Sequence, residues 1–551
     1  MRFELSQVDA HDRLALGGER MGLMHWKPSA TYTRQENFLM KRLVRTRKLF
    51  GFLRAHRHEL FDEAFESELV SMYRDTGAGR APVPPALLAM ATLLQAYHGM
   101  SDAEAVEMTV VDLRWQLVLD RLGSTEPAFS QGALCEFRAR LIRHDMDRTL
   151  LERTVALAST TKAFDAKKLP KTLRIAIDSM PLEGAGRVED TINLLAHAAR
   201  KVISAAASVL DRKAADIARA AGAPMLAESS IKKALDLEWS DPKQKAGAVM
   251  TVIEQLDALE AWVGKHMPEE AKVPPLSGLL ATLRQLRDQD LEPDPLGGGS
   301  RIRQGVAAER RVSVEDGDMR HGRKSKSKRF NGYKRHIAAD LDTELILACA
   351  ITPANRPEEE ATPDLQVDIA RLPQRAEIGS LHIDRGYIGS SLVKDVLARR
   401  GEVLCKPWVA RNRNLFTKAD FVINMRNRTI ECPAGEIEYF QPGSVVEFDP
   451  DACGRCPQRA RCTMASPDSG RTISIAEDEQ LQHRLRKLTA SPSGRHALRE
   501  RVAVEHRLAH LARKQGRRAR YLGIRKNLFD VRRAAAVVNL ETTNRRLLSA
   551  A

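Results

Sequence analysis

The stretch Leu173-Arg-Ile-Ala-Ile-Asp178 decides the fold, because it joins a buried strand to a carboxylate at its end. Four of its first five residues are apolar, which is typical of a strand that a sheet buries on both faces. A second such stretch, Ile378 to Ile383, ends on Asp384, and Gly386 then turns the chain into another helix. Two strands that each end on aspartate predict carboxylates at one edge of an α/β sheet.

Further strands lie between and after these two. The segments from Tyr333 to Asp340 and from Glu344 to Ile351 read as a hairpin, and Val403-Leu-Cys405 reads as a fifth short strand. Asn355, followed by Pro357 and three glutamates, predicts a helix start, since proline and acidic residues suit the first turn. The predicted core is therefore a mixed α/β sheet.

Residues 36–160 are predicted to be helical. Pro85 opens an apolar helix that Gly99 ends, and Ser101 with Glu104 forms a capping box for the next helix. Ser130 can cap another helix. Successive short helices suit a small DNA-binding bundle, and from the pattern alone a plain dimerisation or scaffold domain fits equally well.

The same changes of pattern divide the whole chain. Near its end, Ser491 to Arg520 reads as one basic helix with Leu498, Val502, Leu508 and Leu511 on helical spacing. The expected parts are a helical N-terminal domain (36–160), the first strand of the α/β core (170–189), a helical insertion (190–300), the continued core (301–410), a Cys-rich insertion (411–478) and a basic, helical C-terminal part of the core (479–545).

Length and composition exclude several classes of protein. A chain of 551 residues with 43% hydrophobic residues is long enough for about three to five domains and is not disordered. No stretch approaches the roughly 18 apolar residues of a membrane span, and the first residues lack the apolar centre of a signal peptide. Seven cysteines are too few for a disulfide scaffold, so we expect a reducing cytoplasm and no membrane partner.

Positive charge is concentrated in three windows. Basic residues outnumber acidic ones by 13 from Arg484 to Arg533, by 7 from Arg310 to Arg335, and by 7 from Arg34 to Arg57. Because the whole chain carries +15, the remaining residues together carry −12. Clustered lysine and arginine favour a polyanionic partner such as nucleic acid, whereas an even distribution would reflect residue usage alone.

Asp178, Asp384 and Glu505 are the candidate catalytic residues. Two divalent ions held by clustered carboxylates are the usual means of phosphoryl transfer without a covalent intermediate, and Mg²⁺ prefers such oxygen ligands. Glu505 is one of only three acids in its basic window. Two alternatives stay open: the aspartates can be turn formers, and Glu505 can form a helix ion pair with Arg501, four residues earlier.

Four cysteines form a second candidate site. Cys432, Cys453, Cys456 and Cys462 are spaced C-x20-C-x2-C-x5-C, and four thiolates suit a tetrahedral, structural Zn²⁺. The alternative is four unlinked thiols. Soft thiolates and hard carboxylates select different metals, so a zinc site would be separate from the carboxylate site.

The order of these motifs resembles that of the DDE transposases of bacterial insertion sequences, in the branch with a helical N-terminal domain. The resemblance rests on Ile177-Asp-Ser-Met-Pro-Leu182, Phe330-Asn-Gly-Tyr-Lys334, Asp384-Arg-Gly-Tyr387, Arg501-x3-Glu505 and Arg520-Tyr-Leu-Gly523. A related signature has Tyr three residues before this Arg and Lys seven after the Glu, where this chain has Leu498 and Ala512.

The resemblance implies an RNase-H-like core in which Asp178, Asp384 and Glu505 bind two Mg²⁺, with Mn²⁺ as a substitute. It implies strand cleavage at the inverted repeats of a transposon end and strand transfer into target DNA, by a homodimer on paired ends at the bacterial nucleoid. The residues expected to contact double-stranded DNA are Lys334, Arg501, Lys514, Arg517, Arg518, Arg520, Tyr521 and Lys526.

Two other functions remain compatible with the sequence. One is a catalytically inactive DNA-binding regulator derived from a transposase. The other is a different nuclease of the RNase H fold that acts on RNA hybrids or junctions. Cleavage assays that compare transposon-end duplexes with hybrids distinguish these classes.

Overall fold

The central strand β1 (Leu173–Glu183) organises the structure, a computed structural model. It pairs antiparallel with β5 (Arg329–Asp340) on one side and parallel with β7 (Ile378–His382) on the other. The structure describes residues 24–43, 48–74, 82–165, 167–238, 240–295, 297, 299–325, 327–372, 377–466 and 468–550. Arg45, Arg47 and Lys326 of the basic windows lie outside these ranges.

The sheet around β1 has six strands in a mixed arrangement. Beyond β5 lie β4 (Arg320–Arg323) and β6 (Ile346–Pro353), both antiparallel to it, and beyond β7 lies the parallel β8 (Glu402–Leu404). The sheet is thus antiparallel among β4, β6, β5 and β1 and parallel from β1 through β7 to β8, which is an RNase-H-like arrangement. The fold class expected from the sequence is confirmed.

Alternation along the strands places one apolar core on each face of the sheet. On one face, Ala176 and Ile337 pack with Leu508 and Phe529; on the other, Ile175 and Ile177 pack beneath a separate group of helices. The first face is covered by α9 (Met146–Thr160), α21 (Val502–Gln515) and α22 (Ile524–Ala550). The second is covered by α15 (Thr362–Ala370), α16 (Ser391–Ala398) and α19 (Glu479–Ala490).

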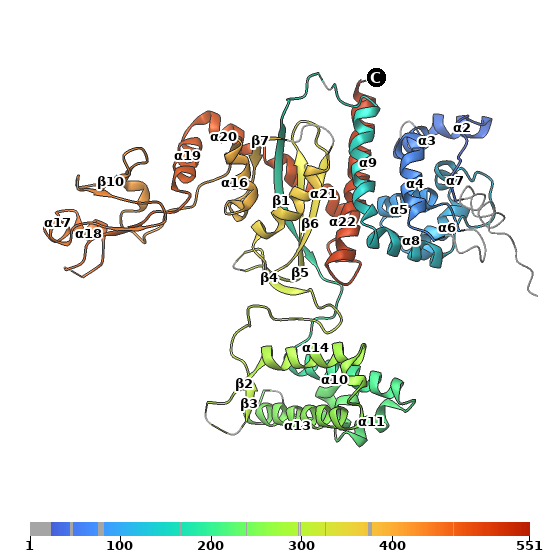
Figure 1. Ribbon diagram of the computed structural model, residues 1–551, viewed down its shortest axis with the longest axis horizontal. Helices are drawn as coiled ribbons and strands as arrows, with labels where there is room; N and C mark the ends of the chain where they lie inside the picture. The colour runs from blue at the N-terminus through green and yellow to red at the C-terminus, as the bar shows by residue number, and fades with distance from the viewer. Residues whose placement is uncertain are drawn as a thin grey trace, which may run out of the picture.

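The N-terminal helices do not form a separate core. They are α2 (Arg34–Arg42), α3 (Lys48–Leu60), α4 (Glu63–Ser71), α5 (Pro85–His98), α6 (Asp102–Val111), α7 (Leu113–Leu119) and α8 (Gln131–Arg143). Their apolar residues belong to the same core as the first sheet face, and α22 lies between these helices and the sheet (Figure 1). The predicted caps are confirmed: Gly99 ends α5 with φ 71°, and Ser101 and Glu104 form the capping box of α6.

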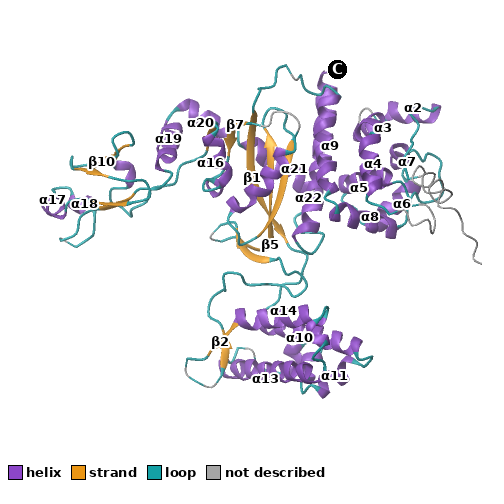
Figure 2. Ribbon diagram, in the orientation of Figure 1, coloured by secondary structure: helices purple, strands orange, loops and turns teal. Residues whose placement is uncertain are grey.

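The helical insertion leaves the sheet after β1 and folds on its own core. It contains α10 (Thr191–Val209), α11 (Ala214–Ala220), α12 (Ile231–Leu235), α13 (Pro242–His266) and α14 (Leu276–Asp290), followed by the short strands β2 (Leu291–Pro293) and β3 (Ser300–Ile302). In Figures 1 and 2 it projects below the sheet as an almost entirely helical unit.

The Cys-rich insertion projects from the sheet as an arm, on the side away from the N-terminal helices (Figure 1). Its elements are β9 (Val422–Asn424), β10 (Thr429–Glu431), β11 (Ile437–Tyr439), β12 (Val445–Glu447), α17 (Pro450–Arg455), α18 (Arg459–Cys462) and β13 (Thr472–Ser474). Phe421, Ile430 and Phe448 form its small core.

Two sequence predictions were wrong in their helix bounds. The expected single helix from Ser491 to Arg520 is broken at Glu500 and Arg501 into α20 (Pro492–Arg499) and α21, and Gly516 ends α21. The acids after Pro357 form a short 3₁₀ turn, η3 (Glu358–Ala361), and α15 begins only at Thr362. Within the described residues, no helix is long and apolar enough to cross a membrane.

Candidate active site

The prediction that the first strand ends on Asp178 is wrong, because β1 continues to Glu183 and Asp178 pairs with Ile337 of β5 in the middle of the strand. The parallel register of β1 and β7 nevertheless brings Asp178 and Asp384 to the same level of the sheet. Ala176 pairs with His382, so Asp178 and Asp384 each lie two residues beyond a paired position. Asp384 caps the 3₁₀ turn η4 (Arg385–Tyr387) and accepts a hydrogen bond from the Arg385 N–H at 2.7 Å. Both carboxylates therefore have positions that the backbone of the sheet determines.

Glu505 reaches the same pocket from the first turn of α21. The pocket has a volume of about 420 Å³. Its charged lining comprises four carboxylates, Asp178, Glu358, Asp384 and Glu505, and four cations, Arg323, Lys324, Lys334 and Arg501. The structure thus brings the three predicted catalytic carboxylates together in one cavity.

Arg501 lies between two of these carboxylates. Its guanidinium nitrogens are 3.2 Å from Asp178 Oδ2 and 2.8 Å from Glu505 Oε1. The helix ion pair considered from the sequence is therefore present, and it extends to Asp178. A cation accordingly bridges a strand carboxylate and a helix carboxylate.

Asp178 is a pocket carboxylate with a shifted pKa. Burial raises the pKa of Asp178 to about 6, and the negative charges of Glu505 and Glu358 act in the same direction. The Arg501 guanidinium and the Ser179 N–H oppose this shift. Asp178 is thus a carboxylate for which a further nearby cation would be favourable.

The donor set fits divalent ions, although its present arrangement does not form a ligand cluster. Carboxylate oxygens are what Mg²⁺ and Mn²⁺ prefer, and Asp178 is short of compensating positive charge. Across the part of the chain that the structure describes, no three His, Cys, Asp or Glu side chains lie close enough together to hold a metal ion. The side chains would have to approach one another around a bound ion.

Glu358 is a pocket residue that the sequence did not reveal. The Ser179 hydroxyl donates a hydrogen bond to its carboxylate. A Cβ at Gly386 would lie 2.2 Å from Glu358 Oε2, so glycine there lets the turn after Asp384 pack against η3. The only sequence signal was the run of three acids after Pro357, which also suits an ordinary helix start.

The predicted DNA-binding residues fall into two groups. Lys334 lies in the carboxylate pocket and donates to the Arg356 carbonyl at 2.7 Å, whereas Arg517 and Lys526 are exposed. The other predicted residues also have partners within the protein, and Arg501 is the cation between Asp178 and Glu505. Arg518 donates hydrogen bonds to the carbonyls of Gly184 and Ala185. Arg520 donates to the carbonyls of Gly99 and Met100. Lys514 forms an ion pair with Glu541, and Tyr521 is largely buried beside Arg138.

The four cysteines of the arm line a separate cavity of about 270 Å³ near β10, α17 and α18, although they do not form a ligand cluster as placed. All four are free thiols. The Ala434 N–H donates to Cys432 Sγ at 3.3 Å, and the Arg471 N–H donates to Cys453 Sγ at 3.4 Å. Burial and the other three thiols raise the pKa of Cys462. Backbone N–H groups aimed at sulfur suit thiolates that bind a metal, so the residues fit a zinc ion by donor chemistry.

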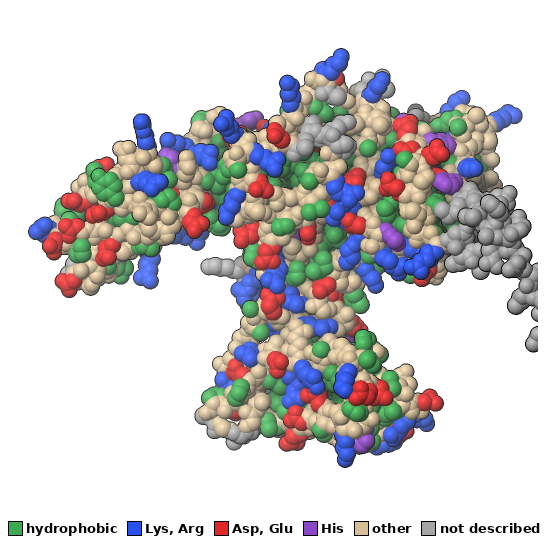
Figure 3. All heavy atoms as spheres, viewed as in Figure 1, with side chains coloured by type: hydrophobic (Ala, Val, Ile, Leu, Met, Phe, Trp, Pro, Cys, Tyr) green, Lys and Arg blue, Asp and Glu red, His purple; other side chains and the backbone are tan. Residues whose placement is uncertain are grey.

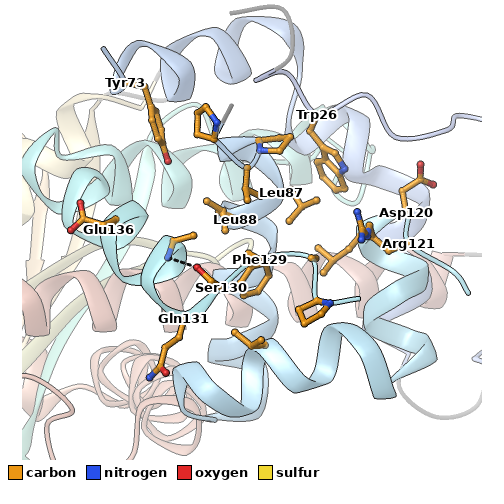
Figure 4. A pocket seen from close by; sticks show the side chains of 18 of the residues that line it. Trp26, Tyr73, Leu87, Leu88, Asp120, Arg121, Phe129, Ser130, Gln131 and Glu136 are labelled. Carbon is orange, nitrogen blue, oxygen red and sulfur yellow. Dashed lines mark hydrogen bonds between the residues drawn. The ribbon is translucent and has the colours of Figure 1, made fainter. Parts of the chain in front are cut away.

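A larger cavity, of about 1040 Å³, lies among the N-terminal helices, away from the carboxylates (Figure 4). Trp26, Leu87, Leu88 and Phe129 give it an apolar lining. Its Ser130 hydroxyl accepts the capping bond from Ala133, drawn as a dashed line. Among the described residues its carboxylates are Asp120 and Glu136, which lie on opposite sides of the cavity in Figure 4 and so form no pair for phosphoryl chemistry.

Comparisons with known families match two segments of the chain. Residues 430–543 match the model of the Transposase DDE domain, and residues 44–140 match that of a Transposase domain, DUF772. The first segment includes Glu505 and the four cysteines, and the second lies in the N-terminal helices. No curated protein and no solved structure matches the chain significantly.

Proposed function

Because the chain belongs to the DDE transposases of insertion sequences, we propose that it binds the ends of its own element and cleaves and transfers DNA strands there. The observation that carries this proposal is the pocket in which Asp178, Asp384 and Glu505 meet. Three separate elements contribute these carboxylates, and the cations around them suit a phosphodiester backbone.

The proposed chemistry is displacement at phosphorus. When bound, divalent ions supply charge stabilisation to the attacking and leaving oxygens of an in-line displacement. Asp178 would hold them from β1, Asp384 from the turn after β7, and Glu505 from α21. Glu358 orients Ser179 beside Asp178. Lys334, Arg323 and Lys324 line the same pocket and would position the DNA strand.

The partners follow from the reaction. A transposase must recognise the inverted repeats of its element and then engage target DNA, so double-stranded DNA is the proposed substrate. We propose that a homodimer holds two paired ends and that the protein acts at the bacterial nucleoid. Sedimentation of the protein with and without end DNA tests the dimer.

The test of the active site is a cleavage assay on a plasmid that carries the inverted repeats flanking the coding region. We expect nicking at the repeat ends with Mg²⁺ or Mn²⁺. The conservative variants Asp178→Asn, Asp384→Asn and Glu505→Gln should reduce nicking to background and retain end-DNA affinity, because each removes a carboxylate charge and keeps the shape.

Each alternative function gives a different result. A parent protein that binds the ends but never cleaves them with either metal is a regulator. Preferential cleavage of an RNA–DNA hybrid identifies another RNase-H-fold nuclease. Variants that cleave as well as the parent would remove these carboxylates from the catalytic site.

We also propose that the cysteine cavity binds one structural Zn²⁺. Four sulfurs in one cavity of the arm, two of them accepting backbone N–H bonds, support this. Purified protein should contain about one zinc per chain, and Cys456→Ser should lower both the zinc content and the resistance of the arm to proteolysis. A metal-free protein whose Cys456→Ser variant resists proteolysis like the parent would contradict the proposal.

A further inference from the structure

A second basic cavity lies on the side of α21 that faces away from the carboxylate pocket. It is about 700 Å³ in volume, and α3, the end of α5, α21 and α22 form its walls. We call it the α21–α22 groove. Its charged and histidine lining consists of Lys48, Arg507, His510, Arg513, Lys514, Glu541 and Arg545. We propose that this groove binds the phosphate backbone of duplex DNA at a distance from the scissile strand.

The geometry of α21 separates the groove from the active site. At 3.6 residues per turn, Arg507, His510 and Lys514 lie about 140–200° around the helix from Glu505. Glu505 and Leu508 line the carboxylate pocket, whereas those three line the groove. Because a helix with its side chains is about 10 Å across, one strand cannot occupy both sites at the same point.

The charges of the groove are not balanced within the protein. Five cations line it against one carboxylate, Glu541, which pairs with Lys514 at 2.8 Å. Just outside the groove, the Glu344 carboxylate forms ion pairs with three guanidiniums. Its oxygens lie 3.0 Å from a nitrogen of Arg507, 2.6 Å from one of Arg545 and 2.7 Å from one of Arg546. Three guanidiniums therefore share one carboxylate.

Two cations of the groove have no such compensation. Lys48 and Arg513 are exposed, and neither forms an ion pair with any residue in the described ranges. Burial and the neighbouring arginines, Arg507, Arg513 and Arg545, lower the pKa of His510, so this imidazole adds no charge of its own at neutral pH. The site therefore has positive charge available for an external anion.

The rest of the lining suits a phosphodiester backbone. The Asn544 amide can donate hydrogen bonds to phosphate oxygens, and the Lys514 ammonium lies 4.0 Å over the ring of Tyr97. Lys48 comes from the N-terminal helices and Arg513 from the C-terminal part. DNA in the groove would thus contact both ends of the chain. The inference rests on the proposed function, which makes DNA the available polyanion.

The test compares two double variants of equal charge change. Lys48→Ala/Arg513→Ala removes the two exposed, unpaired cations of the groove. Lys201→Ala/Lys213→Ala removes two exposed lysines of the helical insertion and is the matched control. Binding of a duplex of random sequence is followed by fluorescence anisotropy at several salt concentrations, and thermal melting shows that each variant is folded.

We expect the groove variant to bind more weakly and its slope of log affinity against log salt to fall by about 1.8, since each phosphate contact contributes about 0.9. The control should match the parent. If the folded groove variant keeps the slope and affinity of the parent, the groove inference is wrong while the proposed function stands. If the parent itself binds no duplex and cleaves none, the proposed function fails as well.

Discussion

At Asp178, burial and two neighbouring carboxylates act against a single guanidinium. The result is a carboxyl whose pKa rises from 3.8 to about 6. Ordinary strand-end aspartates are stabilised by turn N–H groups and have no such shift. A shifted carboxyl in a pocket with three other acids is typical of a functional site and costs the folded protein stability.

This cost gives a pH-dependent prediction for Asp178→Asn. Because the folded pKa is raised, the unfolded chain loses this proton first as the pH rises. The free energy of unfolding of the parent therefore falls between about pH 4 and pH 6 and keeps the lower value above pH 6. In EDTA at pH 7.5, the variant should be more stable than the parent by up to about 3 kcal/mol, from a shift of about two pKa units. The difference should vanish near pH 4.

Calorimetric melting of both proteins at the two pH values measures this difference. Ser179→Ala, which keeps the carboxylate, serves as the control and should show no gain at pH 7.5. A variant that melts below the parent at pH 7.5 would mean that the ion pair with Arg501 outweighs the burial of Asp178.

At the scale of single elements, the sequence predicted the strands better than the helix ends. The period of apolar residues in β1 and β7 reflects burial on both faces, so the presence of both strands followed from it. The end of β1 did not, since the strand continues past Asp178 to Glu183. The break between α20 and α21 could not be predicted from that period, since it depends on a tertiary contact. There Arg174 of β1 pairs with Glu500, and Arg501 turns towards Asp178.

In the pocket, too, residues whose role depends on contacts between elements could not be predicted from a local pattern. Glu358 was not predicted, because its role depends on η3 packing against the turn that contains Gly386, a contact between elements about 30 residues apart in the chain. Arg518 and Arg520 were predicted to contact DNA from their charge alone. In the structure they hydrogen-bond to carbonyl groups of β1's far end and the α5–α6 turn. Charge in a sequence cannot distinguish such bonds from a free surface.

For the whole molecule, the sharing of apolar cores, rather than the length of each part, decides which parts stabilise one another. The N-terminal helices share one apolar core with a sheet face and with α22, the last helix, so the two ends of the chain stabilise each other. Figure 3 shows Lys and Arg side chains over all parts of the visible face, rather than on one part alone. The positive charge is thus spread over all the parts, and the α21–α22 groove is one place where cations outnumber carboxylates.

The helical insertion is the exception, and its separate core predicts that it folds alone. Ile192, Leu256 and Leu283 belong to a core with no member from the sheet. The ion pair of Asp290 with Arg310 and the bonds of Gln289 to Arg311 close its base. A fragment of residues 187–315 contains all these contacts. It should show helical circular dichroism and one cooperative thermal transition.

A fragment of residues 24–165 is the matched comparison. It contains the N-terminal helices without the sheet and α22, which complete their core, so it should melt without cooperativity and expose apolar surface to a dye. Cooperative melting of this fragment would show that the shared core is not required. If the insertion fragment failed to fold, its stability would depend on the sheet to which its two ends are attached.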